Sequence, residues 1–201
     1  MTTTHLLYLH GFRSSPRSVK AKKTAVQVQR CHPQVHWWCP QLPPSPKAAM
    51  QLVSEGLAAW QREPGFERLA VVGSSLGGFY ATWVAEHTGC KAVLLNPAIH
   101  PARDLSRYVG EQTTWHDPAE KFVFRPEFIE ELQRFEAGPL QNPQNYLAVI
   151  AKGDEVLDWR EMTSRYTGAK IKLLEGGDHA LSDFASHLGE ILAFLDLPKT
   201  I

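Results

Sequence analysis

One short pattern constrains this chain more than any other feature of its sequence. The stretch GSSLG at residues 73–77 has the form G-x-S-x-G and follows an apolar run at residues 69–72. An amphipathic stretch with helical spacing begins at Phe79, so the sequence predicts a strand, a sharp turn and a helix. Flanking glycines let neighbouring segments approach such a turn closely, and the helix start offers free amides and a positive dipole end. We therefore interpret Ser75 as a nucleophile.

The context of the pattern matters more than the pattern itself. A chance G-x-S-x-G in a chain of this length has a probability on the order of 5%. Gly73 to Gly78 also has the G-x-x-x-x-G spacing of a phosphate-binding loop. That motif requires Lys and then Ser or Thr at the next two positions, where Phe79 and Tyr80 stand. The strand and helix around Ser75 favour the nucleophile interpretation.

Length, charge and termini exclude several classes of function. A chain of 201 residues is most simply one domain, covering residues 1–201. Its 21 basic and 21 acidic residues balance, and the densest basic run, Lys20 to Lys23, is expected on a solvated helix face, so we expect no nucleic-acid partner. The first five residues have neither the basic nor the apolar character of a signal peptide, so we expect none, and no apolar segment approaches 18 residues. We expect a cytoplasmic protein with no membrane partner, whose three cysteines are reduced.

Strand and helix patterns alternate along the chain. The expected strands are residues 5–9, 35–39, 69–72, 92–95, 146–151 and 170–174. The expected helices begin near Pro16, residue 47, the Ser75 turn, Pro126 and residue 182. This alternation predicts an α/β fold: a three-layer α/β/α sandwich with a six-stranded parallel sheet and right-handed crossovers. Residues 98–125 show no clear period and are too long for an ordinary connection, so we expect a lid or substrate-binding excursion there.

Two segments that follow strands supply candidate partners for Ser75. Ligands of a parallel sheet bind at the carboxyl ends of its strands. His179 follows the last strand, and Asp154 follows the strand before it. A serine hydroxyl needs an imidazole to take its proton, and the imidazole needs a carboxylate to orient it. We assign His179 as general base and then general acid, with Asp154 favoured as the carboxylate.

The acid assignment leaves alternatives open. Glu155 and Asp158 lie close to Asp154 in the sequence, although Asp158 begins a D-x-x-E stretch typical of a helix cap. Asp178 is adjacent to His179, and we expect it to shape the loop. Position at the strand end favours Asp154 over the others.

An acyl-transfer site also needs two donors for an oxyanion. The amide of Leu76, directly after the nucleophile, is one candidate. The other is the amide of Phe12 in the loop after the first strand, where Gly11 permits a close approach. We interpret His10 as a residue that hydrogen-bonds within this loop.

A metal centre is the main competing interpretation of the histidines. Cys31, His32, His36 and Cys39 cluster in the sequence. Their spacing fits no common zinc pattern, Pro33 interrupts it, and His36 and Cys39 point to opposite faces of a strand. We therefore expect no metal and no cofactor.

The chain resembles the α/β-hydrolase superfamily, and within it the small bacterial YqiA-type esterases. The stretches that carry the resemblance are LLYLHGFRSSPRSVKA (6–21), PQLPPSP (40–46), VVGSSLGGFYATW (71–83), LLNPA (94–98), GDEVLDWR (153–160) and EGGDHA (175–180). The resemblance implies a minimal hydrolase with strand order 2-1-3-4-5-6. It also implies an esterase with Ser75 as nucleophile, Asp154 as acid and His179 as base.

These observations together predict a serine esterase. The expected substrate is a small-molecule acyl ester or thioester. Thioesterase, C–C hydrolase and peptidase activities use the same machinery and remain alternatives. A binding protein that keeps the scaffold without catalysis is the alternative from another class, because a fold does not dictate a function.

Overall fold

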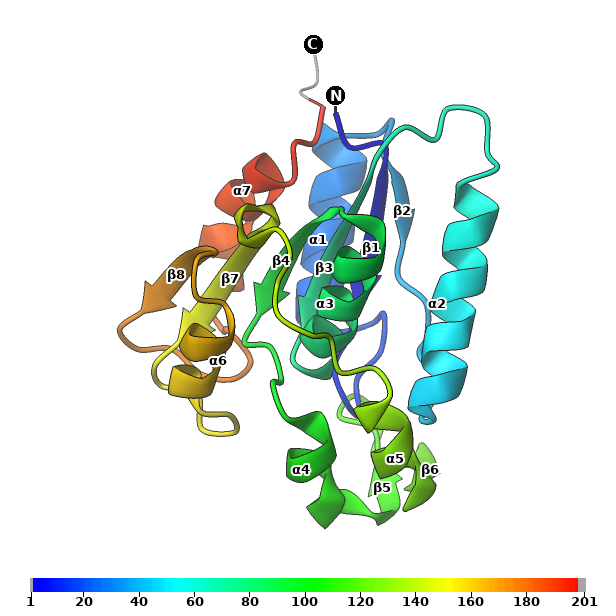
Figure 1. Ribbon diagram of the computed structural model, residues 1–201, viewed down its shortest axis with the longest axis vertical. Helices are drawn as coiled ribbons and strands as arrows, with labels where there is room; N and C mark the ends of the chain where they lie inside the picture. The colour runs from blue at the N-terminus through cyan, green and yellow to red at the C-terminus, as the bar shows by residue number, and fades with distance from the viewer. Residues whose placement is uncertain (1, 199–201) are drawn as a thin grey trace.

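A parallel sheet of six strands forms the centre of the protein (Figure 1). The computed structural model describes residues 2–198. The strands lie in the order β2-β1-β3-β4-β7-β8. Their bounds are β1 (His5–Leu9), β2 (His36–Trp38), β3 (Leu69–Ser74), β4 (Lys91–Leu95), β7 (Tyr146–Ala151) and β8 (Lys170–Leu174). The expected six-stranded parallel sheet is confirmed, and its order matches the expected 2-1-3-4-5-6 once the sheet strands alone are numbered.

Helices cover both faces of the sheet, which completes the expected three layers (Figure 1). One face carries α1 (Val19–Cys31) and α7 (Phe184–Phe194). The other carries α2 (Pro46–Trp60), α3 (Leu76–Thr88) and α6 (Trp159–Arg165). In the part of the chain that the structure describes, none of these helices combines the length and the apolar character needed to cross a membrane.

The strands are apolar on both faces because both faces are covered. In β1, Leu7 and Leu9 pack against the α2 and α3 side, whereas Leu6 and Tyr8 pack against the α1 and α7 side. All four side chains are fully buried. A continuous apolar run is the pattern that a central parallel strand requires.

An excursion between β4 and β7 lies beyond the carboxyl ends of the strands, at the end of the molecule away from the termini (Figure 1). Its elements are α4 (Pro101–Leu105), the 3₁₀ turn η1 (Ser106–Tyr108), the hairpin of β5 (Gly110–Thr113) and β6 (Lys121–Phe124), and α5 (Glu127–Gln133). The chain then returns to the amino ends of the strands, where the 3₁₀ turn η2 (Pro143–Asn145) directly precedes β7. The sequence analysis missed the hairpin, whose strands pair antiparallel and stay outside the main sheet. Four residues per strand are too few to show an alternation.

The first helix begins later than the sequence predicted. It starts at Val19 and not near Pro16, because the Ser18 hydroxyl accepts the amide of Ala21 and so caps the helix. The Ser15 hydroxyl instead accepts the amide of Arg17 and stabilises the preceding turn. The start near Pro16 that the sequence predicted is therefore three residues too early.

Close packing joins α3 to the centre of the sheet. A Cβ atom added at Gly77 would lie 2.0 Å from the carbonyl oxygen of Leu9 on the neighbouring strand β1. A Cβ at Gly73 would lie 2.2 Å from the carbonyl oxygen of Gly77. Backbone lies against backbone here, so neither position has room for a side chain.

Gly77→Ala tests this packing. We expect it to lower the free energy of unfolding by about 2 kcal/mol or more, because a methyl group has no space unless α3 moves. The matched control is Gly189→Ala in α7, where an added Cβ meets nothing within 4 Å. Alanine there should raise stability by about 1 kcal/mol, as it does in an exposed helix. Urea unfolding of both variants measures the difference, and equal effects would contradict the close approach of α3 to β1.

Candidate active site

Ser75 lies on the turn between β3 and α3 in a strained backbone conformation. Its φ is 55° and its ψ is −121°, a region that residues other than glycine rarely adopt. Three backbone hydrogen bonds hold the turn: Ser75 donates its amide to Leu95, and its carbonyl accepts the amides of Gly78 and Ala98. The Ser75 side chain makes no capping bond to α3. Its hydroxyl therefore points away from the helix and is available to another side chain.

The structure brings Ser75, His179 and Asp154 into one hydrogen-bonded chain. Nδ1 of His179 lies 2.8 Å from Oδ2 of Asp154, and Nε2 lies 3.0 Å from Oγ of Ser75. A carboxylate can only accept, so in the neutral imidazole the proton sits on Nδ1 and points to Asp154. Nε2 is then the free nitrogen, and it accepts the hydroxyl hydrogen of Ser75. This is the tautomer that a base acting on Ser75 requires.

Asp154 is the carboxylate that the loop after β7 directs at His179. Its side chain is fully buried, and Oδ1 accepts the amides of Val156 and Leu157, each at 2.8 Å. A buried carboxylate loses solvation, and these two donors together with the imidazole compensate for that loss. The orientation of Asp154 is thus fixed by its own loop.

The neighbouring acids have other roles. The Asp158 carboxylate accepts the amide of Arg160 at the start of α6, as expected for a helix cap. The Glu155 carboxylate accepts the main-chain amide of His179 at 3.0 Å and so holds the histidine loop from outside. Asp178 binds the amide and hydroxyl of Ser182, which shapes the same loop.

Asn96 is a site residue that the sequence analysis missed. It follows β4, is fully buried and has a φ of 41°. Its side-chain amide donates to the carbonyls of Asp178 and His179, and its oxygen accepts the amide of Ala151. Asn96 therefore ties the end of β7 to the loop that carries His179. The sequence feature that could have identified Asn96 is its position directly after a buried strand, at the same edge of the sheet as Ser75.

The two expected oxyanion donors lie on segments next to Ser75. A Cβ added at Gly11 would lie 3.1 Å from the Cβ of Ser75, so the loop after β1 packs against the serine. The amides of Phe12 and Leu76 have no hydrogen-bond partner within residues 2–198. Two unsatisfied amide donors beside a serine can donate hydrogen bonds to a negatively charged oxygen.

His10 holds the Phe12 loop in place. Its Nε2 accepts the amide of Leu42 at 3.0 Å, so Nδ1 carries the hydrogen and donates to the carbonyl of Gly11. Burial lowers the pKa of His10 to about 4, because the charged imidazolium would lose its solvation. His10 thus stays neutral. It hydrogen-bonds within its own loop, as expected from the sequence, and it also binds the segment of Leu42, which was not expected.

A cavity of about 700 Å³ opens in front of Ser75 and His179. Leu105, Tyr108 and Trp115 from the excursion line it, so residues 98–125 do border the serine. Arg13 donates to the carbonyl and hydroxyl of Thr113 and stacks on the ring of Trp115 at 4.2 Å. This contact fastens the hairpin of the excursion to the loop after β1.

Lys20 lines this cavity and does not lie on a solvated face, contrary to the sequence interpretation. Its Nζ donates to the carbonyl of Ala180, the residue after His179. Burial lowers the pKa of Lys20 to about 8, while the carboxylates of Asp178 and Asp154 act in the opposite direction. The sequence could not reveal this, because α7 and its preceding loop lie far from α1 in the chain.

Among residues 2–198, no cluster of metal ligands lies at the serine site. Of residues 2–198, one group of three His, Cys, Asp or Glu side chains has ligand atoms close enough to share an ion. It consists of His5, His36 and Glu63, at the amino ends of β1 and β2. Cys31, His32 and Cys39 are not part of it.

The chain matches one family model over nearly its whole length. The model is described as an uncharacterised protein family (UPF0227), and it matches residues 5–196. A UPF0227 protein of Serratia proteamaculans (strain 568) is 26% identical over 196 residues, covering 96% of this chain and 99% of the relative.

Several solved structures share the fold. Est1E from Butyrivibrio proteoclasticus, solved with ferulic acid bound, has a TM-score of 0.71 at 12% identity and covers 96% of this chain and 89% of its own. Mouse alpha/beta hydrolase domain-containing protein 10 has a TM-score of 0.65 at 13% identity, with 97% and 92% covered. A structure from a study of LipS and LipT, two lipolytic enzymes from a metagenome, has a TM-score of 0.68 at 16% identity, with 97% and 94% covered. At these identities the likeness shows the fold alone.

The pKa of His10 predicts a pH-dependent stability. The folded pKa of about 4 lies below the ordinary value of 6.5, so the unfolded chain binds more protons between these values. The contribution of His10 is therefore present above pH 6.5 and is lost as the pH falls toward 4. The gap corresponds to at most about 3 kcal/mol. Urea unfolding at pH 7 and pH 4 should show a smaller acid loss for His10→Gln than for the wild type, and equal losses would contradict a buried, neutral His10.

Proposed function

The chain belongs to the UPF0227 family and has the α/β-hydrolase fold, and from this premise we propose that it is a serine esterase that hydrolyses small acyl esters or thioesters. The observation that carries the proposal is the chain of short contacts from Ser75 through His179 to Asp154. The strained serine and the two unpaired amides beside it support the same chemistry.

The geometry supports a two-step reaction. Oγ of Ser75 attacks the substrate carbonyl while Nε2 of His179 takes the hydroxyl proton. Asp154 keeps the imidazole oriented and stabilises its positive charge. The amides of Phe12 and Leu76 bind the developing oxyanion, an interaction worth about 3 to 4 kcal/mol for one such donor. His179 then protonates the leaving alcohol or thiol, which leaves an acyl group on Ser75.

Water completes the cycle. His179 removes a proton from a water molecule that attacks the acyl carbonyl, and the same two amides hold the second oxyanion. Collapse of this intermediate returns the proton to Oγ of Ser75 and releases the carboxylic acid. Every proton transfer in this scheme uses Nε2 of His179.

The cavity supports an acyl substrate. Leu105, Tyr108, Val156 and Leu157 give its wall an apolar character next to Ser75. Such a surface favours the hydrocarbon part of an acyl group, whereas the polar atoms of the site converge on the carbonyl. We propose that the excursion at residues 98–125 acts as the substrate-binding lid. LipS and LipT are described as lipolytic enzymes, which agrees with hydrolysis of an ester.

Rival activities make different demands on the leaving group. A thioesterase, a C–C hydrolase and a peptidase would use the same serine, so the triad does not separate them. Turnover rates measured on an oxygen ester, a thioester and an anilide with the same acyl group would separate these activities. A binding protein would turn over none of them.

Substitutions at the two candidate acids test the proposal. With a short-chain p-nitrophenyl ester, Ser75→Ala and His179→Ala should abolish measurable turnover, and Asp154→Asn should lower kcat about 10⁴-fold because the imidazole loses its orienting acceptor. Asp158→Asn is the matched control, since its carboxylate caps α6. It should lower stability by about 1 kcal/mol or less and leave kcat within about twofold. A large loss of kcat in Asp158→Asn with little loss in Asp154→Asn would overturn the assignment.

A further inference from the structure

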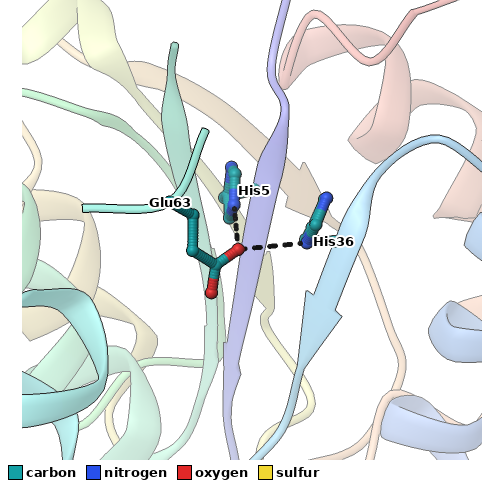
Figure 2. Close-up of side chains that lie close together, drawn as sticks. All are labelled: His5, His36 and Glu63. Atoms are coloured by element: carbon teal, nitrogen blue, oxygen red, sulfur yellow. Dashed lines mark hydrogen bonds and ion pairs between the residues drawn. The ribbon is translucent and has the colours of Figure 1, made fainter. Parts of the chain in front are cut away.

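Two histidines and a glutamate converge at the end of the sheet opposite to Ser75. His5 and His36 are the first residues of β1 and β2 and are directly paired across these parallel strands. Glu63 lies in the turn after α2. Figure 2 shows both imidazoles directed at one carboxylate oxygen of Glu63. The proposed esterase mechanism uses none of these groups.

The distances suit a shared ion better than direct hydrogen bonds. Nε2 of His5 and Nδ1 of His36 each lie 3.5 Å from Oε2 of Glu63. Charge-assisted N–H···O bonds are usually about 2.7–2.9 Å long. Ligand atoms about 2.0–2.1 Å from one tetrahedral zinc ion are about 3.3 Å apart. The three ligand atoms all lie within 4.8 Å of one another, so small movements would bring them around one ion.

The surroundings of His5 fix the position of its ring. It is 1% exposed, and the rings of Trp60 and Phe66 pack against it, each with a centroid distance of 4.9 Å. Its other nitrogen, Nδ1, is 2.9 Å from the hydroxyl of Thr4. A hydrogen bond to the second ring nitrogen fixes the orientation of a ligating imidazole.

His36 and Glu63 provide the adjustable part of the cluster. The two imidazoles are stacked with centroids 4.4 Å apart, so one ring must turn before both nitrogens point at a common ion. The side chain of His36 is 55% exposed and that of Glu63 is 39% exposed, which leaves them free to turn. The same exposure gives water access to a fourth coordination position.

We propose that His5, His36 and Glu63 bind one divalent transition-metal ion of the zinc class, with water as the fourth ligand. Two imidazoles and one carboxylate are a ligand set that zinc accepts with one position open. The ion would join the three-residue edge strand β2 to β1 and to the turn after α2. The site lies at the amino ends of the strands, remote from the serine.

The proposed site gives His36 partners other than those that the sequence interpretation tested. That interpretation tested His36 against Cys31, His32 and Cys39, its neighbours in the chain, and found no zinc spacing. The partners in the structure come from two other segments, which the parallel pairing of β1 with β2 and the turn after α2 bring together. Local spacing could not reveal them.

Zinc titration of tag-free, chelator-treated protein tests the proposal. Competition with a chromophoric chelator should show one equivalent of Zn²⁺ bound by the wild type. His36→Gln and Glu63→Gln should each weaken binding tenfold or more, because two ligands remain. Both positions are partly exposed, so these variants should fold, which circular dichroism checks. Zn²⁺ should also raise the Tm of the wild type more than that of either variant.

Two control variants locate the bound ion. His187→Gln removes a histidine paired with Asp183, and His179→Gln removes the histidine of the serine site; both should keep wild-type affinity. Co²⁺ bound to the wild type should give the intense visible absorption of a tetrahedral site. Absence of stoichiometric binding, undiminished binding in His36→Gln and Glu63→Gln, or loss of binding in a control variant would each overturn the proposal. These outcomes are independent of esterase activity.

Discussion

The close approach of α3 to β3 and β1 is the contact on which the serine site depends. Backbone meets backbone at Gly73 and Gly77, and a side chain at either position would force the helix away from the sheet. With the helix held this near, the chain must reverse at Ser75 with a positive φ, and the hydroxyl is carried clear of the helix. The strain at this residue, of order 1–3 kcal/mol, is balanced by the buried strands on either side.

The parallel sheet then brings the remaining groups to the same edge. Asp154 and His179 follow β7 and β8, and Asn96 follows β4, so three separate crossovers end beside Ser75. Each group is held by contacts that do not involve the serine: amides for Asp154, Glu155 for the His179 amide, and two loop carbonyls for Asn96. The serine is thus not needed to position these groups, and the proposed catalysis by fixed dipoles would require such an arrangement.

Much of this arrangement could be predicted from the sequence, for a physical reason. Buried parallel strands are continuous apolar runs, and the sheet places whatever follows them at one edge, so Ser75, Asp154 and His179 could be related without a structure. Contacts of helices and turns with segments distant in the chain could not be predicted in this way. Lys20 against the His179 loop and Glu63 against two histidines depend on how helices and turns pack. The hairpin of β5 and β6 could not be predicted, because strands of four residues are too short to show an alternation of apolar and polar side chains.

The intact mass of the protein after treatment with a fluorophosphonate, which reacts with serines that a neighbouring base activates, tests directly whether Ser75 is a nucleophile. If it is, the wild type should carry one adduct, mapped by peptide mass spectrometry to Ser75, Ser75→Ala should carry none, and His179→Ala should be labelled much more slowly. A folded wild type that takes no adduct, or an adduct that persists in Ser75→Ala, would contradict a nucleophilic Ser75.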